Sequence, residues 1–282
     1  MAALYIINSR GEKEPFSYEK VLNSARRVGA STELAERIAE TLSQEVYSGM
    51  ETSVIFKRIR QLLSRQAPQS ALKFSLKQGI AKLGPTGFPF EKYIGQVLAK
   101  HGFNVKINQF LSGFCLSDYE IDFVAEKDGL VYVGECKYRN LPGQRVDSGA
   151  VLKNQARFLD IQKGSYFKVK KYQGCKIKTM MVTNTKFTDR AKKYALCSGV
   201  ELLGWRYPKD KGLESLVEKE KLYPVTILPS LRGQAKDILV AEKMMLAKDV
   251  LKIDPINFAK KFKIKVNLLK SLVKEAEISL AE

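Results

Sequence analysis

Two carboxylates and a lysine stand among valines in residues 120–138, EIDFVAEKDGLVYVGECKY. The Asp-Gly pair at 128–129 predicts a two-residue type I′ turn, because both central positions of that turn need positive φ. Counting outward from such a turn pairs Asp122 with Glu135 across the hairpin. Lys137 is two residues beyond Glu135 and points to the same face. Three ionisable groups are therefore expected in one patch.

This patch has the composition of a metal site that acts on phosphate. Two facing carboxylates repel each other unless a cation compensates, and Mg²⁺ or Mn²⁺ is held by one or two carboxylates plus water. The ion would activate a water and neutralise phosphate charge, while Lys137 would orient the nucleophile or stabilise the transition state. The alternative is an exposed sheet face on which Glu135 pairs with Lys137 and Asp122 plays no part.

Net charge is the most pronounced feature of the composition. With 48 Lys and Arg against 30 Asp and Glu, the chain carries a formal charge of +18. Such a field favours a polyanionic partner, nucleic acid above all. The alternative is a lysine-rich organism whose cytosolic proteins are basic in general.

Other residue types narrow the class of protein. The four cysteines lack a C-x-x-C spacing, which favours the reduced thiols of a cytoplasmic protein over disulfides or a zinc site. No apolar run reaches the roughly 18 residues of a membrane span, and the first ten residues lack a signal-peptide pattern. His101 is the only histidine, which excludes His-based triads. No Walker-type loop is present, so ATP would be a regulator and not a fuel.

The elements that must position the patch follow in three blocks. Residues 4–16 predict two short strands around an Arg-Gly turn, and residues 17–82 predict four helices. The expected caps and stops of these helices are Ser17, Gly29, Ser31 or Thr32, Gly49, and Thr52 or Ser53. The cluster GPTGFP at 84–89 predicts the first domain boundary.

The central block is typical of mixed α/β structure. Strands are expected at 103–111, in the 120–138 hairpin, at 176–184 and at 200–205, with helices at 90–101, 149–163 and 188–198. After Pro229 the pattern is helical again, with breaks at Asp254-Pro255 and Lys263. We therefore expect a multi-domain α/β protein with a mostly helical domain at 1–84, a mixed-sheet α/β core at 85–228 and a small helical domain at 229–282.

Two lysine-rich stretches lie outside the hairpin. In KGSYFKVKKYQGCKIK, the aromatic residues Tyr166, Phe167 and Tyr172 could stack on unpaired bases or pack a loop against the sheet. The tail has a helix–turn–helix rhythm with Lys260, Lys261, Lys263 and Lys265 at the turn. It loosely resembles a helix-hairpin-helix element without its glycines, which implies contacts with backbone phosphates. An amphipathic packing tail is the alternative.

The motifs, taken in order, resemble those of the PD-(D/E)XK nuclease superfamily and of its Mrr-like restriction endonuclease domains. Asp122 followed by Glu135-Cys136-Lys137 matches the D…(D/E)XK signature. GPTGFPFEKY resembles the first helix of these domains, and MMVTNTKFTDRAKKYA with GVELLGW resembles their later strand–helix–strand. The likeness covers residues 85–207 and implies a restriction-endonuclease-like fold.

This resemblance also implies roles for single residues. Asp122, Glu135 and the backbone carbonyl of Cys136 would hold Mg²⁺ or Mn²⁺, and Lys137 would be the catalytic lysine. Glu91 on the first helix and Gln155 on the helix after the hairpin would complete the catalytic set.

The first 82 residues resemble an ATP-cone, a nucleotide-sensing module, through RGEKEPFSYEKV, VYSGMETSVI and QAP. The resemblance implies ATP or dATP as a regulatory ligand held by Arg10, Glu14, Lys20, Val21 and Thr52. Where the family has a basic pair, this chain has Asn-Ser followed by Arg10. A module kept for packing or dimerisation is the alternative.

These expectations combine into three hypotheses. The first is a cytoplasmic, metal-dependent DNA endonuclease of restriction or repair type that forms a homo-oligomer and is regulated by an adenine nucleotide. The second is a nucleotide-responsive DNA-binding regulator with an inactive nuclease core. The third is a junction resolvase that acts on branched DNA.

Overall fold

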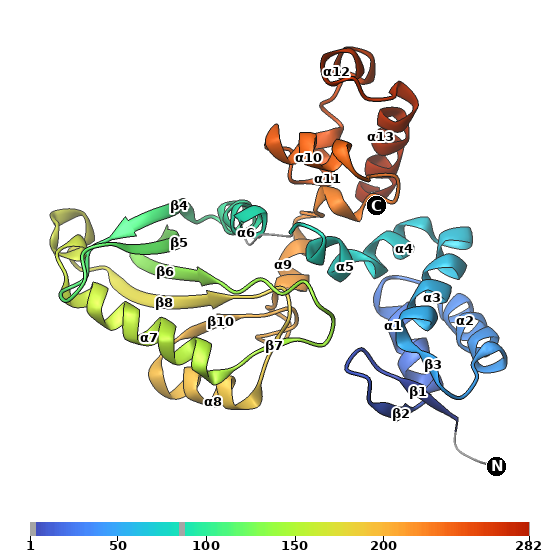
Figure 1. Ribbon diagram of the computed structural model, residues 1–282, viewed down its shortest axis with the longest axis horizontal. Coiled ribbons are helices and arrows are strands. Elements are labelled where there is room, and N and C mark those ends of the chain that lie inside the picture. The colour runs from blue at the N-terminus through green and yellow to red at the C-terminus, as the bar shows by residue number, and fades with distance from the viewer. Residues whose placement is uncertain (1–3, 85–87, 282) are drawn as a thin grey trace. The chain divides into compact units, whose positions relative to one another are not determined.

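The computed structural model describes residues 4–84 and 88–281 of the chain (Figure 1). Residues 85–87, which belong to the predicted boundary GPTGFP, lie outside the described residues. The chain divides into two compact units, one formed by residues 1–79 with 225–282 and the other by residues 80–224. The first unit thus includes both the segment expected as an N-terminal domain and the tail expected as a separate one.

The N-terminal part of the first unit is a small sheet with helices. Its strands are β1 (Tyr5–Ile7), β2 (Lys13–Pro15) and β3 (Met50–Glu51), in the order β2-β1-β3. Its helices are α1 (Tyr18–Arg27), α2 (Thr32–Glu45), α3 (Thr52–Gln66), α4 (Pro68–Phe74) and α5 (Leu76–Ala81). The β1–β2 hairpin was predicted, whereas β3 was not, because two residues that pair in parallel leave no local pattern.

Helix caps show where local rules suffice. The side chains of Ser17 and Ser31 accept hydrogen bonds from the amides of Lys20 and Leu34, as predicted for N-caps. Gly49 was wrong as the stop of α2, since that helix ends at Glu45. The cap predicted for α3 was also wrong, because Glu51 occupies the N-cap position and makes no side-chain cap bond.

The C-terminal part of the first unit is helical, as predicted after Pro229. It contains α10 (Gln234–Ala241), α11 (Ala247–Val250), α12 (Pro255–Phe262) and α13 (Val266–Leu280). Asp254 caps α12 ahead of its first-turn proline, and Lys263 ends it in the left-handed conformation. Both predicted breaks are therefore confirmed, each with its local cause.

The second unit is built on a five-stranded sheet in the order β10-β8-β6-β5-β4. Its long strands are β4 (Asn104–Leu111), β5 (Tyr119–Lys127), β6 (Leu130–Cys136) and β8 (Lys176–Val182), and β10 (Glu201–Leu203) is shorter. β4, β5 and β6 pair in antiparallel fashion, while β6, β8 and β10 run parallel. The prediction of a mixed α/β protein is confirmed.

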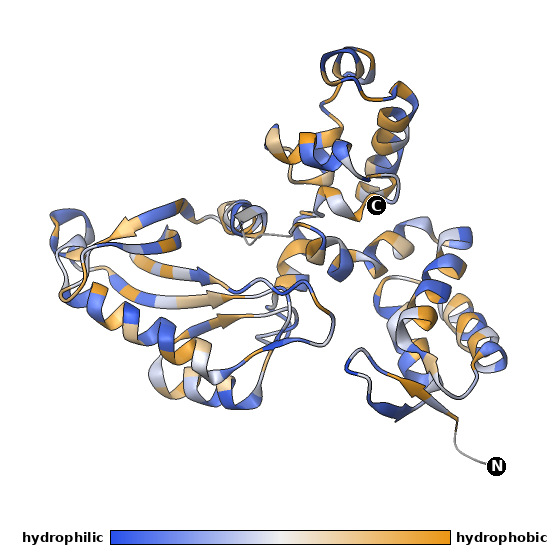
Figure 2. Cartoon of the chain, viewed as in Figure 1, coloured by the Kyte–Doolittle hydropathy of each residue, from blue (hydrophilic) through white to orange (hydrophobic). Residues whose placement is uncertain are grey.

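Helices cover both faces of this sheet. They are α6 (Phe88–Lys100), α7 (Ser148–Lys163) and α8 (Asp189–Ser198), with α9 (Leu213–Lys219) further along the chain. Gly95 of α6 approaches the Ile107 side chain, whereas Asn154 of α7 forms a hydrogen bond with Thr179. The strand register shows that the side chains of Ile107 and Thr179 point to opposite faces of the sheet. α6 and α7 therefore pack on opposite faces. Figure 2 shows that α7 carries both hydrophobic and hydrophilic residues, as expected of a helix with one buried side.

The short strands β7 (Arg145–Val146) and β9 (Lys186–Phe187) form a separate parallel pair. Together with the end of β8, they lie beside the segment that follows the C-terminal end of β6.

Candidate active site

The β5–β6 hairpin has the predicted turn and register. Asp128 and Gly129 both have positive φ, 49° and 73°, and Lys127 pairs with Leu130 across the turn. The pairing continues as far as Phe123 with Gly134. The register predicted for the hairpin is therefore confirmed from the turn to the pair Phe123–Gly134, which directly precedes Asp122 and Glu135.

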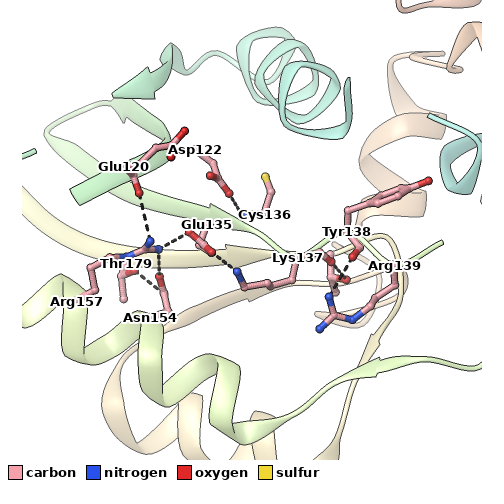
Figure 3. Close-up of polar contacts among 11 residues, drawn as sticks. Glu120, Asp122, Glu135, Cys136, Lys137, Tyr138, Arg139, Asn154, Arg157 and Thr179 are labelled. Atoms are coloured by element: carbon pink, nitrogen blue, oxygen red, sulfur yellow. Dashed lines mark hydrogen bonds and ion pairs between the residues drawn. The ribbon is translucent and has the colours of Figure 1, made fainter. Parts of the chain in front are cut away.

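The two strands separate at the next pair, and this opening forms the site. In place of a ladder partner, the amide of Cys136 donates to Oδ2 of Asp122 at 2.6 Å (Figure 3). Oδ1 of Asp122 has no hydrogen-bond partner among residues 4–84 and 88–281. The carboxylate is thus fixed at the mouth of the hairpin with one oxygen free.

Glu135 is held by two cations. One of its oxygens contacts Nζ of Lys137 and the other contacts Nη2 of Arg157. The Glu135 side chain is only 10% exposed and that of Arg157 20%. Burial alone would raise the pKa of Glu135, but the charge of Arg157 and the two hydrogen bonds outweigh it and lower the pKa. Glu135 is therefore ionised and fixed in orientation.

Arg157, on α7, is a site residue that the sequence prediction missed. It also donates to the carbonyl oxygen of Glu120 and to Oδ1 of Asn154, both at 3.3 Å. Asn154 in turn donates to Thr179 at 2.8 Å, which anchors α7 to β8 (Figure 3). The signal in the sequence was an asparagine and an arginine three residues apart beside the buried Phe158, that is, polar groups on the apolar side of a helix.

Gln155, which was predicted as a supporting residue, is directed elsewhere. Its amide nitrogen donates to the carbonyl oxygen of Ser198, at the end of α8. Its side-chain oxygen has no partner within the described ranges. On a helix, residue 155 is rotated by about 200° from residue 157, so the helix phase and not the sequence distance decides which side chain reaches Glu135.

Two carboxylates at the site lack a cation partner. Glu91, on α6, makes no hydrogen bond or ion pair with any residue in 4–84 or 88–281. Burial, followed by the charges of Asp122 and Glu135, raises the pKa of Glu91 to about 7. Burial and then the charge of Glu135 raise the pKa of Asp122 to about 6. The structure thus brings Glu91, Asp122, Glu135 and Lys137 into one electrostatic cluster, as the sequence predicted.

These groups fit a hard divalent cation. A partly buried carboxylate whose pKa is raised by a neighbouring carboxylate, as that of Asp122 is by Glu135, is stabilised by a cation, and oxygen ligands are what Mg²⁺ and Mn²⁺ prefer. Within the described residues no three His, Cys, Asp or Glu side chains are already arranged around one point. An ion would therefore be bound by Asp122 and Glu135, with a backbone carbonyl and water completing its shell, and Glu135 would have to share one oxygen with it.

Three consecutive polar residues at the end of β8 fix the backbone beyond Lys137. Thr183 donates to the carbonyl oxygen of Lys137 at 2.6 Å. Asn184 accepts from the amide of Arg139 at 2.9 Å and donates to its carbonyl oxygen at 2.7 Å. All three residues, Thr183 to Thr185, are buried. Because buried polar groups need partners, this stretch locks the segment that carries the lysine.

The residues predicted to bind a nucleotide are distributed over the N-terminal sheet and helices. Glu14 of β2 pairs with Lys20 of α1 at 3.6 Å, so these two are brought together. Arg10 pairs with Glu12 at 2.6 Å instead. The side chain of Val21 is buried in the helical core, and Thr52 is the first residue of α3. Binding of ATP or dATP by these residues stays a prediction.

The aromatic residues of the central lysine-rich stretch serve packing. Phe167 and Tyr172 are buried with Phe158 and Ile161, and Tyr166 packs on the same cluster. Of the two alternatives left open by the sequence, packing of a loop is thus confirmed. In the described part of the chain no helix is long and apolar enough to span a membrane.

Fold and site together define a multi-domain mixed α/β protein with an acidic and basic cluster at the open end of a β-hairpin. An uncharacterized protein of Archaeoglobus fulgidus is 39% identical over 160 residues, which cover 56% of this chain and 83% of the relative. The crystal structure of a protein of unknown function, AF1548, is similar with a TM-score of 0.56 and 33% identity, covering 68% of this chain and 97% of that one. The chain therefore belongs to the family of AF1548-like proteins.

Two further similarities complete the comparison. The family model described as AF1548-like, C-terminal, matches residues 223–278. The structure of the MspJI restriction endonuclease in complex with a 27-mer oligonucleotide aligns with 75% of this chain and 48% of that chain, at 14% identity and a TM-score of 0.33. At that score the likeness supports no conclusion about function.

Proposed function

We propose that this protein is a metal-dependent DNA endonuclease of restriction or repair type. The observation that carries the proposal is the hairpin opening, where Asp122 is fixed by the Cys136 amide and Glu135 by Lys137 and Arg157. The charge of +18 supports a polyanionic substrate. The resemblance of these residues to the D…(D/E)XK signature is a further support.

Each residue has a role in this proposal. Asp122, Glu135 and the carbonyl of Cys136 would hold Mg²⁺ or Mn²⁺, and Glu91 would add a further negative charge to the site. When bound, such an ion lowers the pKa of a coordinated water and neutralises charge on the phosphate. The side chain of Lys137 would move, so that its ammonium group leaves Glu135 and pairs with the scissile phosphate. Arg157 would keep Glu135 ionised and oriented while Lys137 moves.

A nuclease assay with matched variants tests the proposal. The purified chain should nick or cut DNA with Mg²⁺ or Mn²⁺ and not in EDTA. We expect Glu135→Gln and Lys137→Met each to lower the cleavage rate at least a hundredfold, the loss typical of removing an electrostatic group from an active site. Glu126→Gln is the control, because Glu126 lies on the same hairpin but pairs with Lys171 near the turn. Cleavage that survives both site variants would contradict the assignment.

One observation favours a second function, a nucleotide-responsive DNA-binding regulator with an inactive core. Both oxygens of Glu135 already have cationic partners, so the carboxylate is neutralised without a metal ion. If this alternative holds, the protein binds DNA, but it does not cleave DNA with any metal ion. Calorimetry with Mn²⁺, ATP and dATP, run beside the nuclease assay, separates the two functions. Nucleotide binding without metal binding or cleavage would favour the regulator.

A further inference from the structure

The turn between α12 and α13 presents lysines that have no protein partner. Lys260, Lys263, Lys265 and Lys270 are exposed, and none of their ammonium groups makes a hydrogen bond or ion pair within residues 4–84 and 88–281. Lys261 differs, since it lies 3.5 Å from Glu242 and over the Phe262 ring. The four free lysines are called the turn lysines below.

Exposed lysines alternate with apolar residues along the turn. The half-buried Ile264 and Val266 alternate with the exposed Lys263 and Lys265. The α12–α13 pair is in turn held by buried residues such as Ala259 and Leu269. The hydrophobic side chains therefore fix the turn to its own unit and leave the cationic side chains in solvent.

Lys263 occupies a position that normally favours glycine. It has φ 55° and ψ 41°, and its amide and that of Ile264 both donate to the carbonyl oxygen of Ala259. This helix ending usually has glycine at the left-handed residue, and a side chain there makes that conformation less favourable. A lysine at this position therefore places a charge at the tip of the turn at the expense of stability.

The arrangement favours an extended anion. No side chain caps the N-terminus of α13, and Lys265 stands at its N-cap, so the positive end of the helix dipole adds to the positive charge of the turn lysines. Lys265 and Lys270 are five residues apart on the helix, or about 7.5 Å. Successive phosphates of a DNA strand advance about 3.4 Å along the axis, so a chain of phosphates can contact several turn lysines at once, whereas a single phosphate cannot.

We propose that the turn lysines bind the phosphodiester backbone of DNA without reading its sequence. This assigns a role to the C-terminal segment, 223–278, that characterises the AF1548-like family. The choice of DNA as the polyanion rests on the proposed function. DNA binding can nevertheless be measured without cleavage, so a failure of the binding proposal can be distinguished from a failure of the proposed nuclease function.

The test is fluorescence anisotropy of a labelled duplex with the full chain in EDTA. The double variant Lys263→Gln/Lys265→Gln should bind about tenfold more weakly, and the slope of log K against log salt should fall by about 1.8, since each phosphate contact contributes about 0.9. Lys274→Gln is the control, an exposed lysine of α13 about 13 Å from Lys265. An equal loss in the control, or no loss in the double variant, overturns the proposal.

A second variant separates binding from structure. Lys263→Gly should raise the midpoint of thermal unfolding, because it relieves the left-handed residue, and should weaken DNA binding severalfold. If Lys263 acted only in ending the helix, Lys263→Gly would raise the stability and leave the affinity for DNA unchanged. That result would overturn the proposal. In the nuclease assay, the control variant Lys274→Gln should cleave as the unaltered chain does, while Glu135→Gln should not. If no variant cleaves, the proposed function fails and the binding result still stands.

Discussion

At the scale of single residues, the acidic groups of the site differ in what they contribute to stability. Glu135 is compensated by Arg157 and Lys137, whereas Asp122 and Glu91 are not. A carboxyl group whose pKa is raised on folding stabilises the protein below its unfolded pKa and loses that contribution as the pH rises through the folded pKa. For Asp122 this window runs from its ordinary value of 3.8 to about 6.

Asp122→Asn should therefore stabilise the metal-free protein at neutral pH. The amide oxygen can still accept from Cys136, and the ionised carboxylate is gone. A shift of two pKa units corresponds to about 3 kcal/mol at most, and we expect about 1 kcal/mol. Thermal unfolding in EDTA should show that the stability gained by the variant is absent near pH 3, grows as the pH rises from 3.8 to about 6, and is full at pH 7.5. Glu135→Gln should destabilise the protein at pH 7.5, since it leaves the charge of Arg157 without a carboxylate partner. A loss of stability in Asp122→Asn would contradict the raised pKa of Asp122.

At the scale of the elements, β5 and β6 pack closely at the last residue pair before the hairpin opens. Gly134 lies directly opposite Phe123, and a Cβ atom at residue 134 would overlap the Phe123 ring. Because Phe123 is fully buried, its ring has no room to move aside. The glycine between Val133 and Glu135 is therefore a packing requirement of the strand that carries the site.

Gly134→Ala should destabilise the second unit by about 1–3 kcal/mol through overpacking. Adding Phe123→Leu should recover part of the loss, since the shorter side chain leaves space for the new methyl group. Urea unfolding of the two single variants and the double variant gives the coupling energy. Strictly additive effects would mean that the ring and the methyl group do not meet.

At the scale of the whole molecule, the positive charge should dominate DNA binding. With about six phosphates contacted, affinity should fall about a thousandfold between roughly 50 and 200 mM salt. Titrations of a duplex at several salt concentrations measure this slope directly. A chain that is basic only because its organism favours lysine would show neither tight binding at low salt nor a steep slope.

The sequence alone determined what depends on neighbours along the chain. The Asp-Gly turn fixed the hairpin register, because positive φ at both central residues allows one pairing. The side chains of Ser17, Ser31 and Asp254 cap helices at the positions that local sequence rules predict. Asp122, Glu135 and Lys137 could be identified as a group for the same reason, since a hairpin converts sequence distance into position.

Only the tertiary structure decided which distant groups complete the site. Arg157 reaches Glu135 and Gln155 does not, because the rotation of α7 against the sheet selects one side of the helix. Glu91 joins the cluster from α6, and Thr183 to Thr185 lock the Lys137 segment from β8. Patterns along the chain can suggest such residues, as they did for Glu91, but the contacts themselves depend on how separately specified elements pack once the hydrophobic core has formed.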